Sequence, residues 1–347
     1  MSGRKDLIVV NTIVPGAYKA LKEAFPDVDI RNASVGESSS PGELNTLSRK
    51  LTDDEVALMQ EADILVVHPS ILSKVMYDLP KTKWVQLSST GANILLHARR
   101  EDTPLPAYTV TRNFSKEVGF IMAEYVVGQI ICHERSWHSS MENQQRKEFD
   151  RGNKFALFRS LSQLTVGILG TGAMGLEIAG ALKCFKCRVH GYSKRPKEAS
   201  ERSPLFDDYW HSTQLPDFLS TCDYVVSVLP STPETRGFLG KDVLKHAKKS
   251  PVLMNIGRGD LIRESDILQA LDSGWISAAI LDVFEKEPLP KESALWNHPK
   301  VVITPHVSGY GNVEIRSKSI ADCFAQNYER FVKGQPLFGS LDWESGY

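Results

Sequence analysis

The stretch Thr165-Val-Gly-Ile-Leu-Gly-Thr-Gly-Ala-Met-Gly175 decides the fold of this 347-residue chain. Its apolar first half predicts a buried strand, and Gly170, Gly172 and Gly175 then follow in the pattern Gly-x-Gly-x-x-Gly. Gly170 permits a tight turn, Gly172 lets the backbone approach a pyrophosphate, and Gly175 allows a helix to pack closely on the strand. The stretch therefore predicts a strand, a phosphate-binding turn and a helix.

The residues after this turn favour a dinucleotide site over a glycine pattern that serves packing alone. A helix is predicted over Met174–Leu182, and a second strand over Cys187–Tyr192. The free N–H groups and the positive dipole end of the helix would face the phosphates, which makes Ala173 and Met174 cofactor contacts. The order strand, turn, helix, strand is the context that the glycine pattern requires.

The end of the second strand bears on which dinucleotide binds. An NAD site places an acid there to hold the ribose hydroxyls. This chain instead has Ser193, Lys194 and Arg195, which would attract a 2′-phosphate. NADPH is therefore the favoured cofactor and NADH remains possible. The alternative is that the two basic residues form a solvated turn.

Strands and helices alternate on both sides of this unit, which predicts α/β architecture with parallel sheets covered on both faces. The sequence predicts helices over Tyr18–Ala24, Val118–Cys132 and Asn312–Val332, and one opened by a capping box at Thr52-Asp-Asp-Glu55. Residues 133–155 are polar and indicate an arm. The predicted strands are Leu7–Val10, Ala62–His68, Trp84–Leu87, Val110–Thr111, Thr165–Leu169, Arg188–Tyr192, Tyr224–Leu229, Val252–Ile256, Ala278–Asp282 and Val301–Thr304.

Length and composition predict a globular, cytoplasmic protein of two domains. Hydrophobic residues make up 41% and charged residues 24%, and the net charge is −1. No basic bias indicates nucleic acid, and no apolar run is long enough to cross a membrane. The five cysteines are odd in number and scattered, as in a reducing compartment. Cys184-Phe-Lys-Cys187 lacks a second ligand pair, so no metal site is predicted.

Three polar residues follow predicted strands further along the chain: Arg258, Glu287 and His306. The carboxyl ends of parallel strands border the crevice where ligands bind. An arginine fork can hold a carboxylate and a carbonyl, and a histidine kept cationic by a glutamate can deliver a proton. Together these residues suit the reversible reduction of a 2-oxo acid. Asp282 would either meet the nicotinamide side of the cofactor or be an ordinary strand-end acid.

Five segments resemble the D-isomer-specific 2-hydroxyacid dehydrogenase family. They are Gly170–Gly175, Leu229-Pro-Ser-Thr-Pro-Glu-Thr235, Asn255-Ile-Gly-Arg-Gly-Asp260, Leu281–Pro288 and Leu295-Trp-Asn-His-Pro-Lys-Val-Val-Ile-Thr-Pro-His306. The stretch from Pro288-Leu-Pro to Leu295-Trp-Asn-His298 and the closing Ser345-Gly-Tyr347 look most like the glyoxylate/hydroxypyruvate reductase A branch.

The resemblance implies a role for each matching residue. Arg258 would be the catalytic arginine, His306 the acid/base and Glu287 its partner. Ile256 would offer its carbonyl to the nicotinamide side, and the substrate carboxylate would lie on the backbone amides of Thr90 and Gly91. The remaining cofactor contacts implied are Leu229, Pro230, Thr235, Gly257 and Ser308.

The resemblance also implies the architecture and the assembly. A Rossmann-type doubly wound cofactor domain, residues 114–307, would be inserted into a smaller flavodoxin-like substrate domain, residues 1–113 and 308–347. Residues 118–155 would form the contact of a homodimer. The substrate turn Ser88-Ser-Thr-Gly-Ala-Asn93 and the stretch His306-Val-Ser-Gly-Tyr310 depart from the family pattern. The rival interpretation is a non-enzymatic nucleotide sensor, such as the corepressors that share the fold.

Overall fold

The computed structural model describes residues 6–34 and 50–344 and divides the chain into two units. Unit 1 comprises Met1–Glu117 and Gly311–Tyr347, and unit 2 is the inserted segment Val118–Tyr310. The boundaries between the two units, after residues 117 and 310, lie a few residues beyond the predicted boundaries at 113 and 307. The stretch Gly36 to Asn45, whose Ser, Gly and Pro content predicts a loop, and the closing Ser345-Gly-Tyr347 lie outside the described residues.

Unit 1 is built on a parallel sheet of five strands in the order β2-β1-β3-β4-β5. This is the flavodoxin-like order 2-1-3-4-5, as predicted. The strands are β1 (Ile8–Asn11), β2 (Ile30–Asn32), β3 (Ile64–Val67), β4 (Trp84–Leu87) and β5 (Thr109–Thr111). The helices of this unit are α1 (Ala17–Ala24), α2 (Asp53–Gln60), α3 (Pro69–Val75), α4 (Asn93–His97) and α11 (Val313–Val332).

Local chemistry fixes the ends of two predicted helices in unit 1. The backbone N–H of Thr52 donates to Glu55 Oε2 at 2.8 Å, and the Glu55 N–H donates to Thr52 Oγ1 at 3.3 Å, so the capping box opens α2. Asn312 Oδ1 accepts the N–H of Ile315 at 2.9 Å and begins α11. Phe324 of α11 stacks on Trp84 of β4, which places this C-terminal helix against the first sheet.

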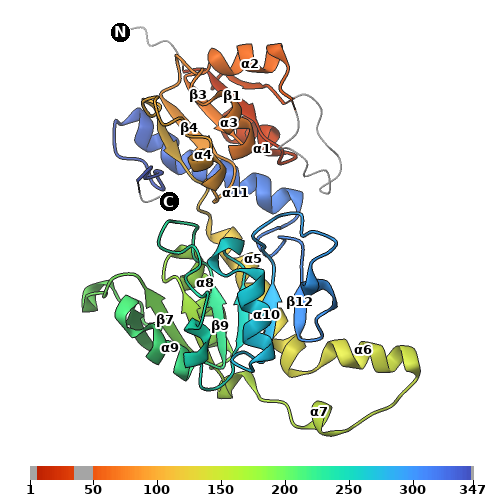
Figure 1. Ribbon diagram of the computed structural model, residues 1–347. Helices are drawn as coiled ribbons and strands as arrows, with labels where there is room; N and C mark the ends of the chain where they lie inside the picture. The colour runs from red at the N-terminus through yellow and green to blue at the C-terminus, as the bar shows by residue number, and fades with distance from the viewer. Residues whose placement is uncertain (1–5, 35–49, 345–347) are drawn as a thin grey trace. The chain divides into compact units, whose positions relative to one another are not determined.

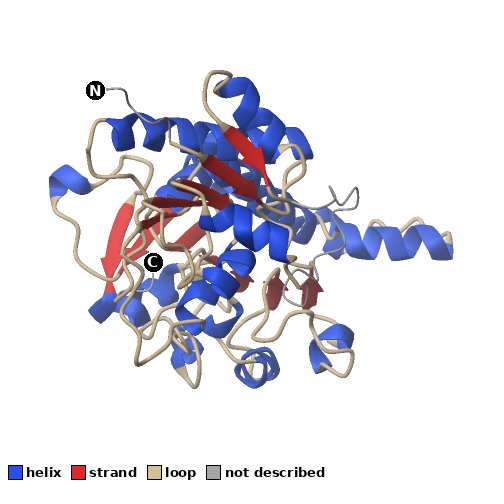
Figure 2. Cartoon of the chain, turned by 90° about the horizontal axis from the view of Figure 1, so that it is seen from above, coloured by secondary structure: helices blue, strands red, loops and turns tan. Residues whose placement is uncertain are grey.

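Unit 2 is built on a parallel sheet of seven strands in the order β12-β11-β10-β9-β6-β7-β8 (Figure 1). The strand order reverses between β6 and β9, as in a Rossmann fold, and helices flank the strands (Figure 2). The doubly wound prediction is therefore confirmed. The strands are β6 (Thr165–Leu169), β7 (Arg188–Ser193), β8 (Asp208–His211), β9 (Tyr224–Ser227), β10 (Val252–Asn255), β11 (Ala278–Leu281) and β12 (Val301–Ile303). The other helices are α5 (Lys116–Glu134), which begins in unit 1, α6 (Trp137–Arg146), α7 (Asn153–Ala156), α8 (Ala173–Cys184), α9 (Leu215–Thr221) and α10 (Glu264–Asp272).

An arm leaves unit 2 after α5 and returns before β6, with α6 extending away from the sheet (Figure 1). Its two ends are tied together at the base. Arg159 Nη2 donates to Glu134 Oε1 at 2.6 Å and Arg159 Nε to Glu134 Oε2 at 3.1 Å. The Arg135 guanidinium lies 3.9 Å from the centroid of the Phe158 ring. These two contacts therefore fix the angle at which the arm leaves unit 2.

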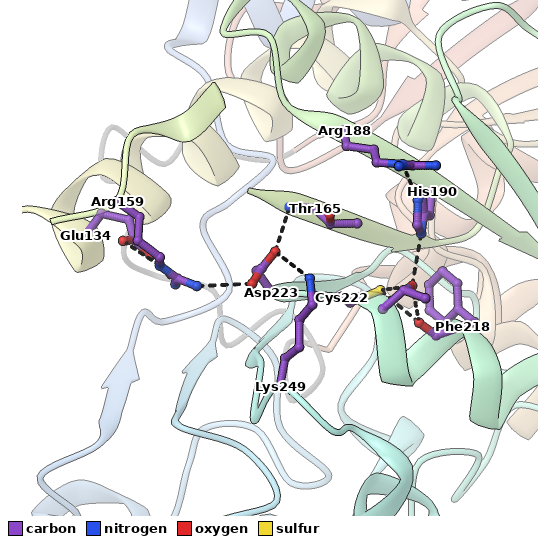
Figure 3. A network of polar contacts seen from close by, with 10 residues as sticks. Glu134, Arg159, Thr165, Arg188, His190, Phe218, Cys222, Asp223 and Lys249 are labelled. Atoms are coloured by element: carbon purple, nitrogen blue, oxygen red, sulfur yellow. Dashed lines mark hydrogen bonds and ion pairs between the residues drawn. The ribbon is translucent and has the colours of Figure 1, made fainter. Parts of the chain in front are cut away.

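The same arginine connects the arm to the amino ends of the sheet strands (Figure 3). Arg159 Nη1 donates to Asp223 Oδ1 at 3.2 Å, and Asp223 Oδ2 accepts the N–H of Thr165 at 2.8 Å. Tyr224 Oη donates to Glu134 Oε1 at 2.7 Å. Burial would raise the pKa of Glu134, but its bonds to Arg159 and Tyr224 lower it overall. The network anchors β6, the strand that carries the glycine turn.

No helix in the described part of the chain has both the length and the apolar character that a membrane span needs.

Candidate active site

The glycine turn at the carboxyl end of β6 has a conformation that side chains would prevent. Gly170 has a φ of 114°, and its N–H donates to the carbonyl of Tyr192 at 3.0 Å. A Cβ on Gly175 would lie 1.9 Å from the carbonyl oxygen of Gly170. A Cβ on Gly172 would meet nothing within 4 Å. The turn thus presents open space at Gly172, where a phosphate group would approach α8.

Gly175→Ala and Gly172→Ala form a matched pair that separates packing from ligand approach. Gly175→Ala should lower the free energy of unfolding by about 3 kcal/mol, because the new methyl group must displace backbone. Gly172→Ala should leave the melting temperature near that of the wild type and still weaken dinucleotide binding. Differential scanning calorimetry and a dinucleotide titration measure the two effects. Equal melting temperatures for both variants would contradict the packing argument.

The last residue of β7 and the first two of the turn after it are the three residues predicted to select the dinucleotide. Ser193 Oγ donates to the carbonyl of Arg195 at 2.8 Å. Lys194 Nζ is 3.1 Å from Glu234 Oε1, in the loop after β9. Lys197 Nζ donates to the carbonyl of Thr171 in the glycine turn at 3.4 Å. Sequence analysis did not identify Glu234 or Lys197 as parts of this region.

The loop after β9 is held by its own hydrogen bonds. Thr235 Oγ1 donates to the carbonyl of Pro230 at 2.6 Å, and the Thr232 N–H donates to Thr235 Oγ1 at 2.8 Å. A Cβ on Gly257 would lie 2.7 Å from the carbonyl oxygen of Leu229. Leu229 and Gly257 are therefore adjacent, and Gly257 directly follows the buried Ile256. The cofactor contacts predicted in the loop after β9 thus lie beside those predicted at the end of β10.

Arg258 follows β10, at the carboxyl edge of the unit 2 sheet. Asn255 Nδ2 donates to its carbonyl at 2.8 Å, and Arg258 Nη1 donates to the carbonyl of Gly257 at 2.6 Å. Burial lowers the pKa of Arg258, while the carboxylates of Glu287 and Asp260 oppose that shift. An arginine remains charged at neutral pH even so. The site therefore holds a partly desolvated cation within the field of the predicted glutamate.

His306 and Glu287 form the pair that the sequence predicts. His306 Nδ1 is 2.7 Å from Glu287 Oε2, and Glu287 Oε1 accepts the N–H of Phe284 at 3.0 Å. Burial would raise the pKa of Glu287, but the hydrogen bond and charge of His306, the Phe284 N–H and the charge of Arg258 lower it overall. The imidazole is 47% exposed, so its second nitrogen has room to meet a substrate. The pair can hold and release a proton.

Asp282 is fully buried and holds the turn that carries the histidine. Its Oδ1 accepts the N–H of Val307 and its Oδ2 the N–H of Ser308, both at 2.9 Å. Thr304 Oγ1 donates to Asp282 Oδ1 at 2.5 Å and is 2.7 Å from Tyr125 Oη. His306 has a φ of 55°, which is uncommon for a residue with a Cβ. The structure gives Asp282 a positioning role, and its contact with the nicotinamide remains a prediction.

Comparison with known proteins decides the family of this chain. The family model for the NAD binding domain of D-isomer specific 2-hydroxyacid dehydrogenases matches residues 127–308. A crystal structure of a D-isomer specific 2-hydroxyacid dehydrogenase family protein from Aeromonas salmonicida subsp. salmonicida shares 30% identity. It has a TM-score of 0.80, with 98% of this chain and 100% of that chain covered. This chain belongs to the D-isomer specific 2-hydroxyacid dehydrogenase family.

Two further members were solved with a nicotinamide cofactor. A dehydrogenase from Xanthobacter autotrophicus in complex with NADPH and MES shares 27% identity at a TM-score of 0.80. An NADPH-dependent glyoxylate/hydroxypyruvate reductase from Sinorhizobium meliloti, in complex with NADP and sulfate, shares 27% identity at a TM-score of 0.76. Each match covers 99% of this chain and 100% of the other. The protein is thus an NAD(P)-dependent oxidoreductase.

The turn that the family resemblance assigns to the substrate carboxylate lies in unit 1, between β4 and α4. Thr90 Oγ1 donates to the carbonyl of Asn113 at 2.7 Å, and Ser89 Oγ donates to the carbonyl of Gly91 at 3.1 Å. Both hydroxyls are therefore used to hold the turn. The backbone amides of Thr90 and Gly91 remain the predicted carboxylate ligands of this dehydrogenase.

Proposed function

We propose that this dehydrogenase reduces a small 2-oxo acid of the glyoxylate or hydroxypyruvate type to the D-2-hydroxy acid and prefers NADPH. The observation that carries the proposal is the His306–Glu287 pair at 2.7 Å, within the field of Arg258. The carboxylate orients the imidazole, a group that can take up and donate a proton. A family member 27% identical to this chain is a glyoxylate/hydroxypyruvate reductase, which supports the substrate class.

Each residue of the site has a distinct role in this reduction. A bound nicotinamide supplies the hydride that C2 of the substrate receives. His306 donates a proton to the oxygen on C2, and Glu287 stabilises the charged imidazole until then. Arg258 binds the substrate carboxylate and polarises the carbonyl, as a planar fork with several donors allows. Thr90 and Gly91 are proposed to bind the substrate through their backbone N–H groups.

The preference for NADPH rests on the turn after β7. Ser193 stands where an NAD site has an acid, and Lys194 and Arg195 follow it with cationic side chains. The solved relatives in complex with NADPH or NADP support the same choice. The proposed cytoplasmic location stays a prediction.

Turnover assays with purified protein test the proposal directly. Glyoxylate, hydroxypyruvate, pyruvate and phenylpyruvate would each be offered with NADPH and with NADH, and cofactor oxidation followed by absorbance. We expect the highest kcat/KM for glyoxylate or hydroxypyruvate with NADPH. Cofactor binding without turnover of any 2-oxo acid would instead favour the non-enzymatic sensor.

We also propose that residues 118–155 form the contact of a homodimer, and that the arm (residues 135–158) provides its exposed apolar surface. The arm exposes Trp137, Met141, Phe149 and Leu157, with Phe149 87% exposed. Exposed apolar residues gathered on one segment mark interaction surfaces. The tie between Glu134 and Arg159 would present them at a fixed angle, which limits the entropy lost on association.

Charges placed on the arm should separate the subunits. The double variant Phe149→Glu and Leu157→Glu is expected to have the mass of a monomer in sedimentation or light-scattering experiments, because each carboxylate would be buried unpaired. Phe185→Glu, at an exposed aromatic in the same unit, is the matched control and should leave the mass unchanged. A dimer that survives both arm substitutions would place the contact elsewhere.

A further inference from the structure

An NAD site carries an acid at the end of β7, and in this chain a carboxylate from another part of the sequence lies close to that strand end. Ser193 occupies the strand end, but Glu234, 41 residues further along, places its Oε1 3.1 Å from the Nζ of Lys194. Both side chains are more than half exposed, at 62% for Lys194 and 58% for Glu234. Neither is therefore required for the core.

This ion pair spans the carboxyl end of β6, where the glycine turn lies. β7 and β9 are the two neighbours of β6 in the sheet. The Gly170 N–H donates to Tyr192 in β7, and the Val228 N–H after β9 donates to Leu169 in β6. The pair therefore links the two loops that flank the glycine turn. That position is where the adenosine half of a dinucleotide binds in this fold.

The two charges of the pair have opposite effects on the affinity for NADPH. The Lys194 ammonium attracts a 2′-phosphate, whereas the Glu234 carboxylate repels it. The same carboxylate can accept a hydrogen bond from the 2′-hydroxyl of NADH, as the strand-end acid of an NAD site does. Lys194 also lowers the pKa of Glu234, so the carboxylate is ionised at neutral pH.

We propose that the Lys194–Glu234 pair sets the ratio of NADPH to NADH affinity, with Glu234 as the residue that retains NADH. The 2′-phosphate of a bound NADPH would pair with Lys194 and break its ion pair with Glu234. With NADH the ion pair would stay intact, and the Glu234 carboxylate would accept a hydrogen bond from the ribose. The inference rests on the proposed function, because it assumes that the dinucleotide lies on the glycine turn and that both forms bind.

Glu234→Gln tests the proposal with a change of one charge and almost none of shape. Dissociation constants for NADPH, NADH, adenosine 2′,5′-bisphosphate and AMP would be measured by calorimetry at low salt. The variant should bind NADPH and the bisphosphate about threefold to tenfold more tightly and NADH a few-fold more weakly, as expected for an exposed charge pair. The gain should shrink as salt is added.

The matched control is Asp242→Asn, which changes the net charge equally. Asp242 pairs with Lys245 at 3.4 Å, is 60% exposed and lies outside the proposed site. This variant should keep the wild-type ratio of affinities. The proposal is overturned if Glu234→Gln changes the dissociation constants of NADPH and NADH by one common factor. It is also overturned if the variant changes their ratio only as far as Asp242→Asn does.

Wild-type binding separates failure of this proposal from failure of the proposed function. A wild-type protein that prefers NADPH and turns over glyoxylate, combined with an unchanged ratio in Glu234→Gln, removes the role of Glu234 alone. A wild-type protein that binds neither dinucleotide removes the proposed function, and the role of Glu234 falls with it.

Discussion

Arg258→Ala should lower kcat/KM for glyoxylate or hydroxypyruvate by about 10³-fold or more while the affinity for NADPH changes little. The guanidinium is the group proposed to bind the substrate carboxylate and to stabilise the charge that develops on the carbonyl oxygen. It is partly desolvated, which strengthens both interactions relative to water. The backbone around it is held by Asn255, so the truncated side chain should not unfold the turn. Steady-state kinetics and a cofactor titration measure the two quantities.

Two further variants sharpen the interpretation of Arg258. Arg258→Lys keeps the charge and loses the planar fork, so it should recover only part of the activity if bidentate binding matters. Arg188→Ala removes an exposed arginine of the same unit that pairs with Asp208, and it should retain wild-type kcat/KM. Normal turnover in Arg258→Ala, or an equal loss in Arg188→Ala, would remove the catalytic role assigned to Arg258.

The sheets were largely predictable because parallel strands covered on both faces are continuous apolar runs. β1, β3, β4, β6, β9, β10 and β11 are buried along their whole length, and each was predicted with an error of at most two residues per end. The two strands that sequence analysis missed, β2 and β8, lie at sheet edges. Two of the three residues of β2 are exposed, and β8 is only half-buried. Neither Ile-Arg-Asn nor Asp-Tyr-Trp-His is a continuous apolar run, so neither sequence indicated a buried strand.

Contacts between candidate site residues were predictable where the residues follow strand ends, and were hidden where two loops meet. Glu287 and His306 follow β11 and β12, and the structure brings them into contact as predicted. Glu234 meets Lys194 only because the loops after β9 and β7 flank the same turn. Asp282 accepts the N–H groups of Val307 and Ser308 because of the way the turn folds. No spacing in the sequence predicts these hydrogen bonds.

His306→Gln should reduce kcat/KM for the 2-oxo acid by about 10²- to 10⁴-fold, because glutamine can bond the substrate oxygen but cannot deliver a proton to it. The variant should fold normally. The turn is fixed by the backbone N–H groups of Val307 and Ser308, which donate to the Asp282 carboxylate, and the imidazole contributes little to burial. NADPH affinity should be unchanged within about twofold. A variant that retains wild-type kcat/KM would exclude His306 as the proton donor.

The pH dependence of activity in Glu287→Gln distinguishes the role of Glu287 from that of the proton donor His306. Loss of the carboxylate removes the acceptor that lies 2.7 Å from His306 Nδ1, so reductase activity should fall about tenfold or more near neutral pH, and the variant should lack any loss of activity that protonation of Glu287 causes in the wild type. In the wild type, the pKa of Glu287 lies below its ordinary value of 4.5. The carboxylate is therefore ionised at every pH above that value, and its protonation should not lower the wild-type activity until the pH falls below 4.5. Identical pH profiles for wild type and Glu287→Gln would show that the 2.7 Å contact does not control the proton.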